Sequence, residues 1–326
     1  MIAFDGVSKT FPGGILAVRN LTLEVAQGET LVFLGTSGSG KTTTMKMVNR
    51  LVEPSSGCIR IDGTDIMEQD PVALRRGIGY AIQHIGLFPH MTVADNIAVV
   101  PRMLRWETGR TDGRIDELLG LVGLEPGDFR DRYPSQLSGG QKQRVGVARA
   151  LAADPPIVLM DEPFGALDPI TREQLQNEFL ELESEIQKTI LFVTHDVFEA
   201  VKMGDRIALL DAGRLQQVAA PCELVEQPAN DFVDAFLGQH RFQLSLLTHS
   251  ISSLMEESAA IPIPTAPSRG PALRVRDSLI DALDRFKHAG CDELPVRRRG
   301  RTVGTLRKKS LLAEISRVLG ELEATS

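Results

Sequence analysis

Residues 35–42, Gly-Thr-Ser-Gly-Ser-Gly-Lys-Thr, form a glycine-rich octet between two segments of different hydrophobic pattern. The octet follows the apolar run 30–34 and opens a segment with helical spacing, 41–51. This order of strand, G-x-x-x-x-G-K-[ST] and helix is the context in which the motif binds nucleotide phosphates. Glycines let backbone N–H groups approach the phosphates, and the helix N-terminus adds positive charge. The octet therefore predicts an α/β nucleotide-binding fold, with a chance glycine-rich turn as the alternative.

Length and composition limit the class of protein. With 326 residues, the chain is long enough for about two domains. Its 42% hydrophobic and 24% charged residues are typical of a soluble globular protein. We find no apolar stretch of about 18 residues and no signal-peptide pattern. The cysteines are odd in number and widely spaced, which favours neither a disulfide framework nor a zinc site: Cys58, Cys222 and Cys291. These features predict a cytoplasmic protein with at most a peripheral membrane role.

The charge is unevenly distributed. Residues 241–326 hold 14 Lys and Arg against 10 Asp and Glu, whereas residues 1–240 hold 22 against 33. Proteins that bind duplex nucleic acid depend on a cationic surface. The acidic main body therefore argues against nucleic acid as a partner.

Strands and helices are predicted to alternate through the main body. Residues 1–30 have the pattern of short strands, and the runs 157–161, 189–195 and 207–210 have that of buried parallel strands. Residues 71–150 are mainly helical in pattern, with breaks expected near Pro89, Pro101, Pro126 and Pro134. The alternation indicates an α/β sheet with ligands at the carboxyl ends of its strands.

The composition changes near residues 240–270. Residues 252–271 are rich in Ser, Pro and Ala, as linkers are. Beyond them, 278–289 has helical spacing, 293–296 and 302–306 have strand character, and a helix is expected from Ser310. We expect a small α+β unit at the C-terminal end.

Four residues are candidates for the chemistry of nucleotide hydrolysis. Lys41 should reach the β- and γ-phosphates, and the Thr42 hydroxyl should bind Mg²⁺. Asp161 and Glu162 end an apolar strand, where Asp161 can hold Mg²⁺ and Glu162 can act as general base toward water. Taken alone, an Asp-Glu pair would more often be a solvated strand end.

The run Leu137-Ser138-Gly139-Gly140-Gln141 is a second serine- and glycine-containing helix start, although it could be a simple N-cap. It resembles the signature of ATP-binding cassette (ABC) ATPases. ABC proteins dimerise head to tail, so that each ATP lies between one chain's phosphate loop and the other chain's signature. The resemblance covers residues 1 to about 240. It implies an ABC-type P-loop ATPase with a RecA-like mixed sheet core, an antiparallel β-subdomain and a helical subdomain at about 88–150.

The resemblance also implies roles for single residues. Glu162, His195 and Gln83 would be catalytic, with His195 near the γ-phosphate and Gln83 contacting water and Mg²⁺. Mg²⁺ would be held by Thr42, Gln83 and Asp161. Phe11 would stack on adenine, and Asp168 belongs to the loop that crosses the dimer interface. Phe11 and His195 have structural alternatives as a core side chain and a strand-end residue. The ATP-binding set is Phe11, Gly35, Ser37, Gly38, Ser39, Gly40, Lys41, Thr42, Thr43, Ser138, Gly139, Gly140, Gln141 and Asp168.

A narrower resemblance concerns transport. The runs 43–51, 83–93, 101–106 and 161–172 look like the ATPase subunits of importers for osmoprotectants such as glycine betaine, choline, carnitine or proline betaine. It implies a homodimer peripheral to the cytoplasmic face of the inner membrane, docked on permease subunits and served by an extracytoplasmic substrate-binding protein. The helical region after Gln83, including residues 88–91, is the expected docking surface, unless Phe88 and Met91 belong to the core. The alternatives are an amino-acid, sugar or anion importer, a non-transport ABC ATPase, and a regulator with an inactive ATPase.

The C-terminal region resembles one cystathionine-β-synthase (CBS) motif, notably at 292–296 and 300–306. The expected organisation is an ATP-binding domain at 1–240, a linker and start of the CBS-like unit at 241–270, its remainder at 271–318 and a tail at 319–326. A complete CBS pair would need two subunits, and Ser310 stands where nucleotide-binding versions commonly have aspartate. The basic residues of 297–309 could meet anionic lipid, or form a solvated face without function.

Overall fold

The computed structural model describes residues 1–82, 86–165, 167–186, 188–252, 254, 271–275, 277–298 and 301–325. The chain divides into two compact units, residues 1–218 and 219–326, which are described separately below. The ATP-binding domain predicted at 1–240 and the divisions beyond it stay predictions, because a compact unit need not coincide with a functional domain.

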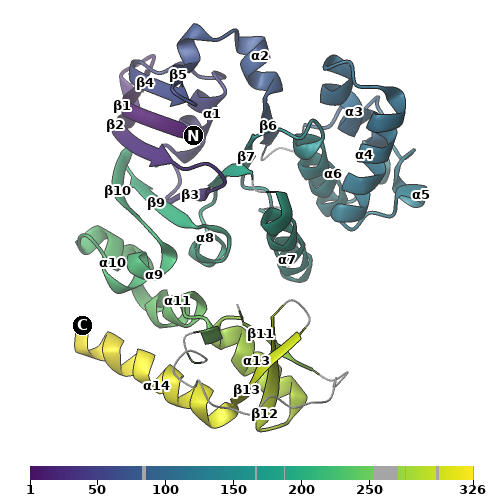
Figure 1. Ribbon diagram of the computed structural model, residues 1–326. Coiled ribbons are helices and arrows are strands. Elements are labelled where there is room, and N and C mark those ends of the chain that lie inside the picture. Colours follow the sequence, from purple (N-terminus) through teal and green to yellow (C-terminus); the bar gives the residue numbers. More distant parts are fainter. Residues whose placement is uncertain are drawn as a thin grey trace. The chain divides into compact units, whose positions relative to one another are not determined.

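An antiparallel sheet forms one part of the first unit (Figure 1). Its strand order is β2-β1-β4-β5, with bounds Ile15–Val25, Ile2–Phe11, Ser56–Ile61 and Thr64–Asp65. Apolar side chains alternate along β1, where Ile2, Phe4 and Val7 are buried. The Phe4 ring meets Phe33 of the second sheet edge to face, with centroids 6.3 Å apart. One hydrophobic core therefore serves both sheets.

The second sheet has the strand order β10-β9-β3-β8-β7-β6. The strands span Arg214–Ala219, Arg206–Asp211, Thr30–Gly35, Thr189–Val193, Ile157–Asp161 and Ile78–Ala81. Five of them, β9 to β6 in this order, are paired in parallel. β10 follows β9 through a turn at Ala212 and Gly213, whose φ values of 43° and 79° are those of a two-residue hairpin. The sheet is therefore mixed, and the carboxyl ends of β3, β8 and β7 share one edge.

Helices complete the first unit. Following the chain, they are α1 (Lys41–Val48), α2 (Pro71–Arg76), α3 (Val93–Met103), α4 (Thr108–Leu121), α5 (Pro126–Phe129), α6 (Gly139–Leu151), α7 (Pro169–Ile186) and α8 (Val197–Met203). α3, α4 and α6 pack on one another and form a helical group on the opposite side of β6 and β7 from α1 (Figure 1).

The structure corrects one local prediction and confirms another. Residues 78–81 form strand β6 within a stretch predicted to be mainly helical. Gly79 permits this strand because it has no Cβ: any other residue would place its Cβ 2.2 Å from the carbonyl oxygen of Ala150 in α6, which is too close. The break expected near Pro101 is confirmed, although the proline itself lies inside α3. The helix ends two residues later, so the missing N–H of the proline disturbs only its last turn.

The second unit is α+β. It begins with α9 (Pro221–Glu226), α10 (Asp231–Leu237) and α11 (Arg241–Thr248), so a helix occupies the start of the range predicted as linker. Then come β11 (Leu273–Arg274), α13 (Leu279–Ala289), β12 (Glu293–Arg298), β13 (Arg301–Arg307) and α14 (Lys308–Thr325). β11 is parallel to β12, and β12 is antiparallel to β13. Phe286 of α13 lies at the centre of this unit's own core, fully buried. The predicted helix and two strands of this region are confirmed, while the CBS resemblance stays a prediction.

Among the described residues, no helix is both long and apolar enough to cross a membrane.

Candidate functional site

The phosphate-loop octet connects β3 to α1 in a conformation that requires glycine. Gly35 has φ 149° and Gly40 has φ 99°, a range that L-residues rarely adopt. A Cβ on Gly35 would lie 2.1 Å from the carbonyl oxygen of Leu210, and one on Gly40 would lie 2.4 Å from that of Ala17. Backbone of β2 and β9 therefore presses against the loop from two sides. This packing keeps the loop folded and directs it at the N-terminus of α1.

Lys41 lies inside the loop that it follows. Its Nζ donates hydrogen bonds to the carbonyl oxygens of Gly35 and Thr36, both at 2.8 Å, and the residue is buried. Burial lowers the pKa of Lys41, whereas the carboxylates of Glu162 and Asp161 act in the opposite direction. The ammonium group is thus held where an octet of this type brings its lysine to nucleotide phosphates.

Thr42 and Asp161 form the oxygen-rich part of the site. The Thr42 hydroxyl donates to Asp161 Oδ1 at 2.9 Å, which joins the start of α1 to the end of β7. Burial raises the pKa of Asp161, and the Thr42 bond and the charges of Lys46 and Lys41 oppose this effect. Hydroxyl and carboxylate oxygens are the hard donors that Mg²⁺ prefers. These two side chains fit a magnesium site, since the Thr42 hydroxyl oxygen and Asp161 Oδ1 are already 2.9 Å apart.

Glu162 follows Asp161 and is brought to His195 by the neighbouring strand. The register pairs Asp161 with Val193, and the Glu162 N–H donates to the Val193 carbonyl oxygen at 3.0 Å. Its carboxylate Oε1 lies 3.1 Å from His195 Nδ1. Glu162 has φ 47°, and Gln143 of α6 donates to its carbonyl oxygen at 3.3 Å. A carboxylate and an imidazole therefore meet at the sheet edge that carries the phosphate loop.

The signature segment caps α6. The Ser138 N–H donates to Gln141 Oε1 at 2.9 Å, and the Gln141 N–H donates to Ser138 Oγ at 3.3 Å. Ser138 and Gly139 are exposed, and a Cβ on Gly139 would meet nothing within 4 Å. Gly140 faces Leu167 instead, where a Cβ would lie 2.8 Å from a leucine methyl group. This arrangement leaves the positive end of the helix open to an anion from outside.

The remaining predicted residues are dispersed. Phe11 ends β1, and the Lys9 ammonium lies 5.2 Å from its ring centroid. Asp168 precedes α7 and accepts from the Thr171 N–H at 3.0 Å, a bond that lowers the pKa of Asp168. Ser37, Gly38 and Ser39 lie in the octet, and Thr43 lies in the first turn of α1. Gln83 lies outside the described residues.

The structure thus brings together five predicted residues: Lys41, Thr42, Asp161, Glu162 and His195. The signature residues begin α6, which belongs to the helical group (Figure 1), and this helix reaches the five residues through the bond of Gln143 to Glu162. The predicted site is therefore divided between the sheet edge and the start of α6.

One supporting residue was not predicted. Gln143 lies only two positions after the signature, yet its contact with Glu162 depends on how α6 packs, for which the sequence gives no signal.

Asn96 was also missed, although it organises the predicted docking segment. The side chain is fully buried in α3 and its Oδ1 accepts from the Phe88 N–H at 2.8 Å. Its Nδ2 donates to the carbonyl oxygens of Phe88, Met91 and Thr92 at 3.2, 3.2 and 2.9 Å. Phe88 itself is 40% exposed, so it is not a core residue. Asn96 therefore holds a loop that presents an aromatic ring at the surface.

Comparisons with known proteins agree with this fold. The family model described as ABC transporter matches residues 18–165. The glycine betaine/carnitine/choline transport ATP-binding protein OpuCA of Bacillus subtilis is 58% identical over 241 residues, 74% of this chain and 63% of its own length. The match thus covers less than two thirds of that relative.

A second relative is matched over its whole length. The glycine betaine uptake system ATP-binding protein YehX of Escherichia coli is 48% identical over 316 residues, 96% of this chain and 100% of its own. Among solved structures, a dimeric ATP-binding cassette in a post-hydrolysis state with ADP and Pi is 35% identical, with a TM-score of 0.62. That similarity covers 68% of this chain and 98% of the cassette. The predicted ABC fold is confirmed, and the chain belongs to the ATP-binding proteins of the ABC transporter family.

Proposed function

We propose that this chain is the ATP-hydrolysing subunit of an ABC importer for quaternary-amine osmoprotectants such as glycine betaine or choline. The convergence of Lys41, Thr42, Asp161, Glu162 and His195 on one sheet edge carries the ATPase part of the proposal. The substrate class is supported by the two relatives, whose names include glycine betaine.

Each part of the site has a proposed role. Backbone N–H groups of the octet and the Lys41 ammonium bind the β- and γ-phosphates. Thr42 and Asp161, with Gln83 as the third predicted ligand, would hold Mg²⁺, which supplies positive charge against the phosphates. Glu162 accepts a proton from the attacking water as general base, and His195, 3.1 Å from its carboxylate, fixes its orientation and reaches the γ-phosphate.

The separation of the two half-sites favours a homodimer. The exposed N-terminus of α6 at Ser138 offers an anion site that lies apart from the chain's own phosphate loop. In a head-to-tail pair it would meet the nucleotide bound to the other subunit, with Phe11 stacked on adenine and Asp168 at the interface. The dimeric state of the solved cassette supports this arrangement.

The proposed partner is a membrane permease served by an extracytoplasmic substrate-binding protein, and the subunit would lie peripherally on the cytoplasmic face. Phe88 and its loop, held by Asn96, form the proposed docking surface. For the C-terminal unit we propose a single CBS-like module, supported by its strand and helix order β11-α13-β12-β13-α14. For the basic run 297–309 we propose contact with anionic lipid; Arg299 lies outside the described residues, and Arg307 is paired with Glu293 at 2.8 Å.

The decisive experiment is ATP-driven uptake of labelled glycine betaine into proteoliposomes that contain this chain and its permease. Competition by unlabelled choline, without competition by maltose, sulfate or histidine, is the expected result. A Glu162→Gln complex serves as the matched control and should take up no substrate. ATP hydrolysis without betaine uptake would refute the substrate class but keep the ATPase, whereas copurification with ribosomes would refute the transport role.

A further inference from the structure

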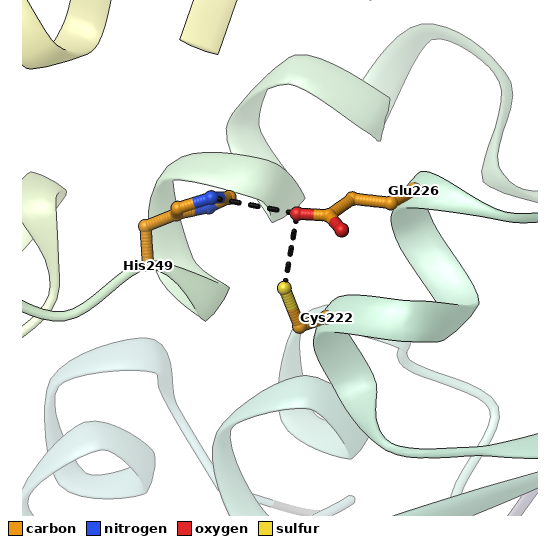
Figure 2. A group of neighbouring side chains, drawn as sticks. All are labelled: Cys222, Glu226 and His249. Carbon is orange, nitrogen blue, oxygen red and sulfur yellow. Dashed lines mark hydrogen bonds and ion pairs between the residues drawn. The ribbon is translucent and has the colours of Figure 1, made fainter. Parts of the chain in front are cut away.

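A second group of reactive side chains lies in the C-terminal unit, in addition to the nucleotide site. Cys222 and Glu226 are four residues apart on α9, and therefore share one face of the helix. The Cys222 Sγ lies 3.0 Å from Glu226 Oε1, which faces His249 at the end of α11 (Figure 2). Sulfur, carboxylate oxygen and imidazole nitrogen lie within 4.8 Å of one another. The three residues form a compact group of potential metal ligands.

The imidazole of His249 is oriented by its other nitrogen. Nδ1 lies 2.8 Å from the carbonyl oxygen of Ser245, which can only accept a hydrogen bond, so the proton of this contact belongs to Nδ1. Nε2 then points at Glu226 Oε1, at 3.4 Å (Figure 2). In the neutral ring Nε2 carries a lone pair, which faces a lone pair of Glu226 Oε1. Histidine ligands in metal sites commonly have this arrangement, with one nitrogen bonded to a carbonyl and the other on the metal.

The supporting helices are held together independently of the three side chains. Arg241 at the start of α11 donates to the carbonyl oxygens of Val225 and Glu226 at 2.9 and 3.1 Å. It also forms an ion pair with Asp234 of α10 at 2.9 Å. The end of α9 is therefore fixed to the start of α11 before any ligand binds, which contributes to a preorganised site.

The distances suit a tetrahedral ion. With ligand bonds of about 2.0–2.3 Å, a tetrahedral zinc ion separates neighbouring N and O ligands by about 3.4 Å, and S and O ligands by about 3.6 Å. The observed Nε2–Oε1 distance is 3.4 Å, and the Sγ–Oε1 distance is 3.0 Å. Loss of the S–H···O hydrogen bond would let the sulfur move outward by the required distance, about 0.6 Å. Thiolate, imidazole and carboxylate together favour zinc over Mg²⁺ or Ca²⁺.

We propose that Cys222, Glu226 and His249 form a zinc site that joins α9 to α11, with a water molecule as the fourth ligand. Glu226 is exposed and the other two residues are half-buried, so the ion and its water can enter from solvent. On binding, the thiol proton passes to solvent and the sulfur binds as thiolate. The site is independent of nucleotide, because none of its residues belongs to the phosphate loop or to the signature.

The thiol is protonated when the metal is absent. Burial and the adjacent Glu226 carboxylate raise the pKa of Cys222 to about 11. Without a metal the three groups would still hold together through the bond from the thiol to the carboxylate and the contact of His249 with the same oxygen. The experiment must therefore detect a metal–sulfur bond and not only a folded cluster.

Cobalt(II) titration of the full chain without nucleotide makes this distinction. A thiolate-to-cobalt charge-transfer band at one equivalent, displaced by Zn²⁺, is the expected result. Co²⁺ at Thr42 and Asp161 would have only oxygen ligands and give no such band. The control variant Cys58→Ser/Cys291→Ser keeps Cys222 as its single cysteine and should retain the band.

Loss of a ligand should weaken zinc binding. Outer-sphere partners of metal ligands typically contribute about 10–100-fold to affinity, so Cys222→Ser should lose at least about 100-fold in a chelator competition. His249→Gln is the second variant, used if the first does not fold by circular dichroism. Zinc affinity within threefold of the parent in either folded variant would overturn the proposal. Absence of a charge-transfer band in the parent protein would also overturn it.

Discussion

Replacement of Asn96 by alanine should release the loop 86–91 while leaving the nucleotide site folded. The carboxamide has one oxygen acceptor and two N–H donors, and it contacts one N–H and three carbonyl oxygens. Two donors cannot serve three carbonyls fully, so the side chain makes the equivalent of about three hydrogen bonds.

The cost follows from what each partner loses. The carbonyl oxygens of Thr92 and Phe88 also accept from the N–H groups of Asn96 and Met91, so they keep a partner in the variant. The Phe88 N–H loses its acceptor, which costs about 1–3 kcal/mol if it stays buried. Two further bonds at about 0.5–1.5 kcal/mol each bring the total to about 2–6 kcal/mol. Since the loop can open to water, we expect a value of about 2–3 kcal/mol, a 30–150-fold increase in loop opening.

Native-state hydrogen exchange at the Phe88 amide measures this opening directly. The Asn96→Asp variant is a matched comparison, because it keeps an acceptor for Phe88 but replaces the donors with an oxygen that faces carbonyls. ATP binding by the Asn96→Ala chain should change less than threefold, while its permease-stimulated ATPase activity should fall. Exchange at Phe88 within threefold of the parent rate would show that Asn96 does not hold the loop, and would refute the reasoning.

Three further outcomes are expected. Glu162→Gln should lower phosphate release by about 10²–10⁴ while ATP binding and dimer formation by gel filtration persist, and rapid hydrolysis would exclude Glu162 as the base. Gly40→Ala should weaken ATP binding at least tenfold in calorimetry, because positive φ and the 2.4 Å contact cost about 1–3 kcal/mol or more, whereas Gly63→Ala in an open turn should not. Burial raises the pKa of Glu199, so the folded state holds this proton to higher pH than the unfolded state. Glu199 should therefore lower the stability in urea as pH rises through that interval, and Glu199→Gln should reduce the fall that buried Asp161 also causes, while exposed Glu68→Gln should not.

Local patterns predicted which residues meet at the candidate site. The octet and the apolar runs before Asp161 and His195 are continuous in sequence, and parallel pairing then brings their ends to one edge. The ABC fold follows from the same motifs and is confirmed, whereas the roles of the single residues and the CBS resemblance stay predictions.

Other features depend on packing that no local pattern contains. Strand β6 was hidden because its glycine, Gly79, is explained only by the close approach of Ala150. The spacing of the cysteines does not predict a zinc site at Cys222, because its neighbour on α9 is Glu226 and the third residue, His249, lies at the end of α11. Asn96 is one of several polar residues of α3, beside Asp95, and the loop that it bonds cannot be inferred from its position.

The bonds of Lys41 have a consequence for the design of inactive variants. Its ammonium group closes a ring with the carbonyls of Gly35 and Thr36, so the side chain is a brace of the loop as well as a contact for phosphate. If a Lys41→Ala chain fails to bind ATP, the failure could come from a collapsed loop or from the missing charge, and the binding assay would not distinguish the two. Glu162→Gln is the cleaner null allele for genetic complementation, because it keeps the loop's internal bonding intact.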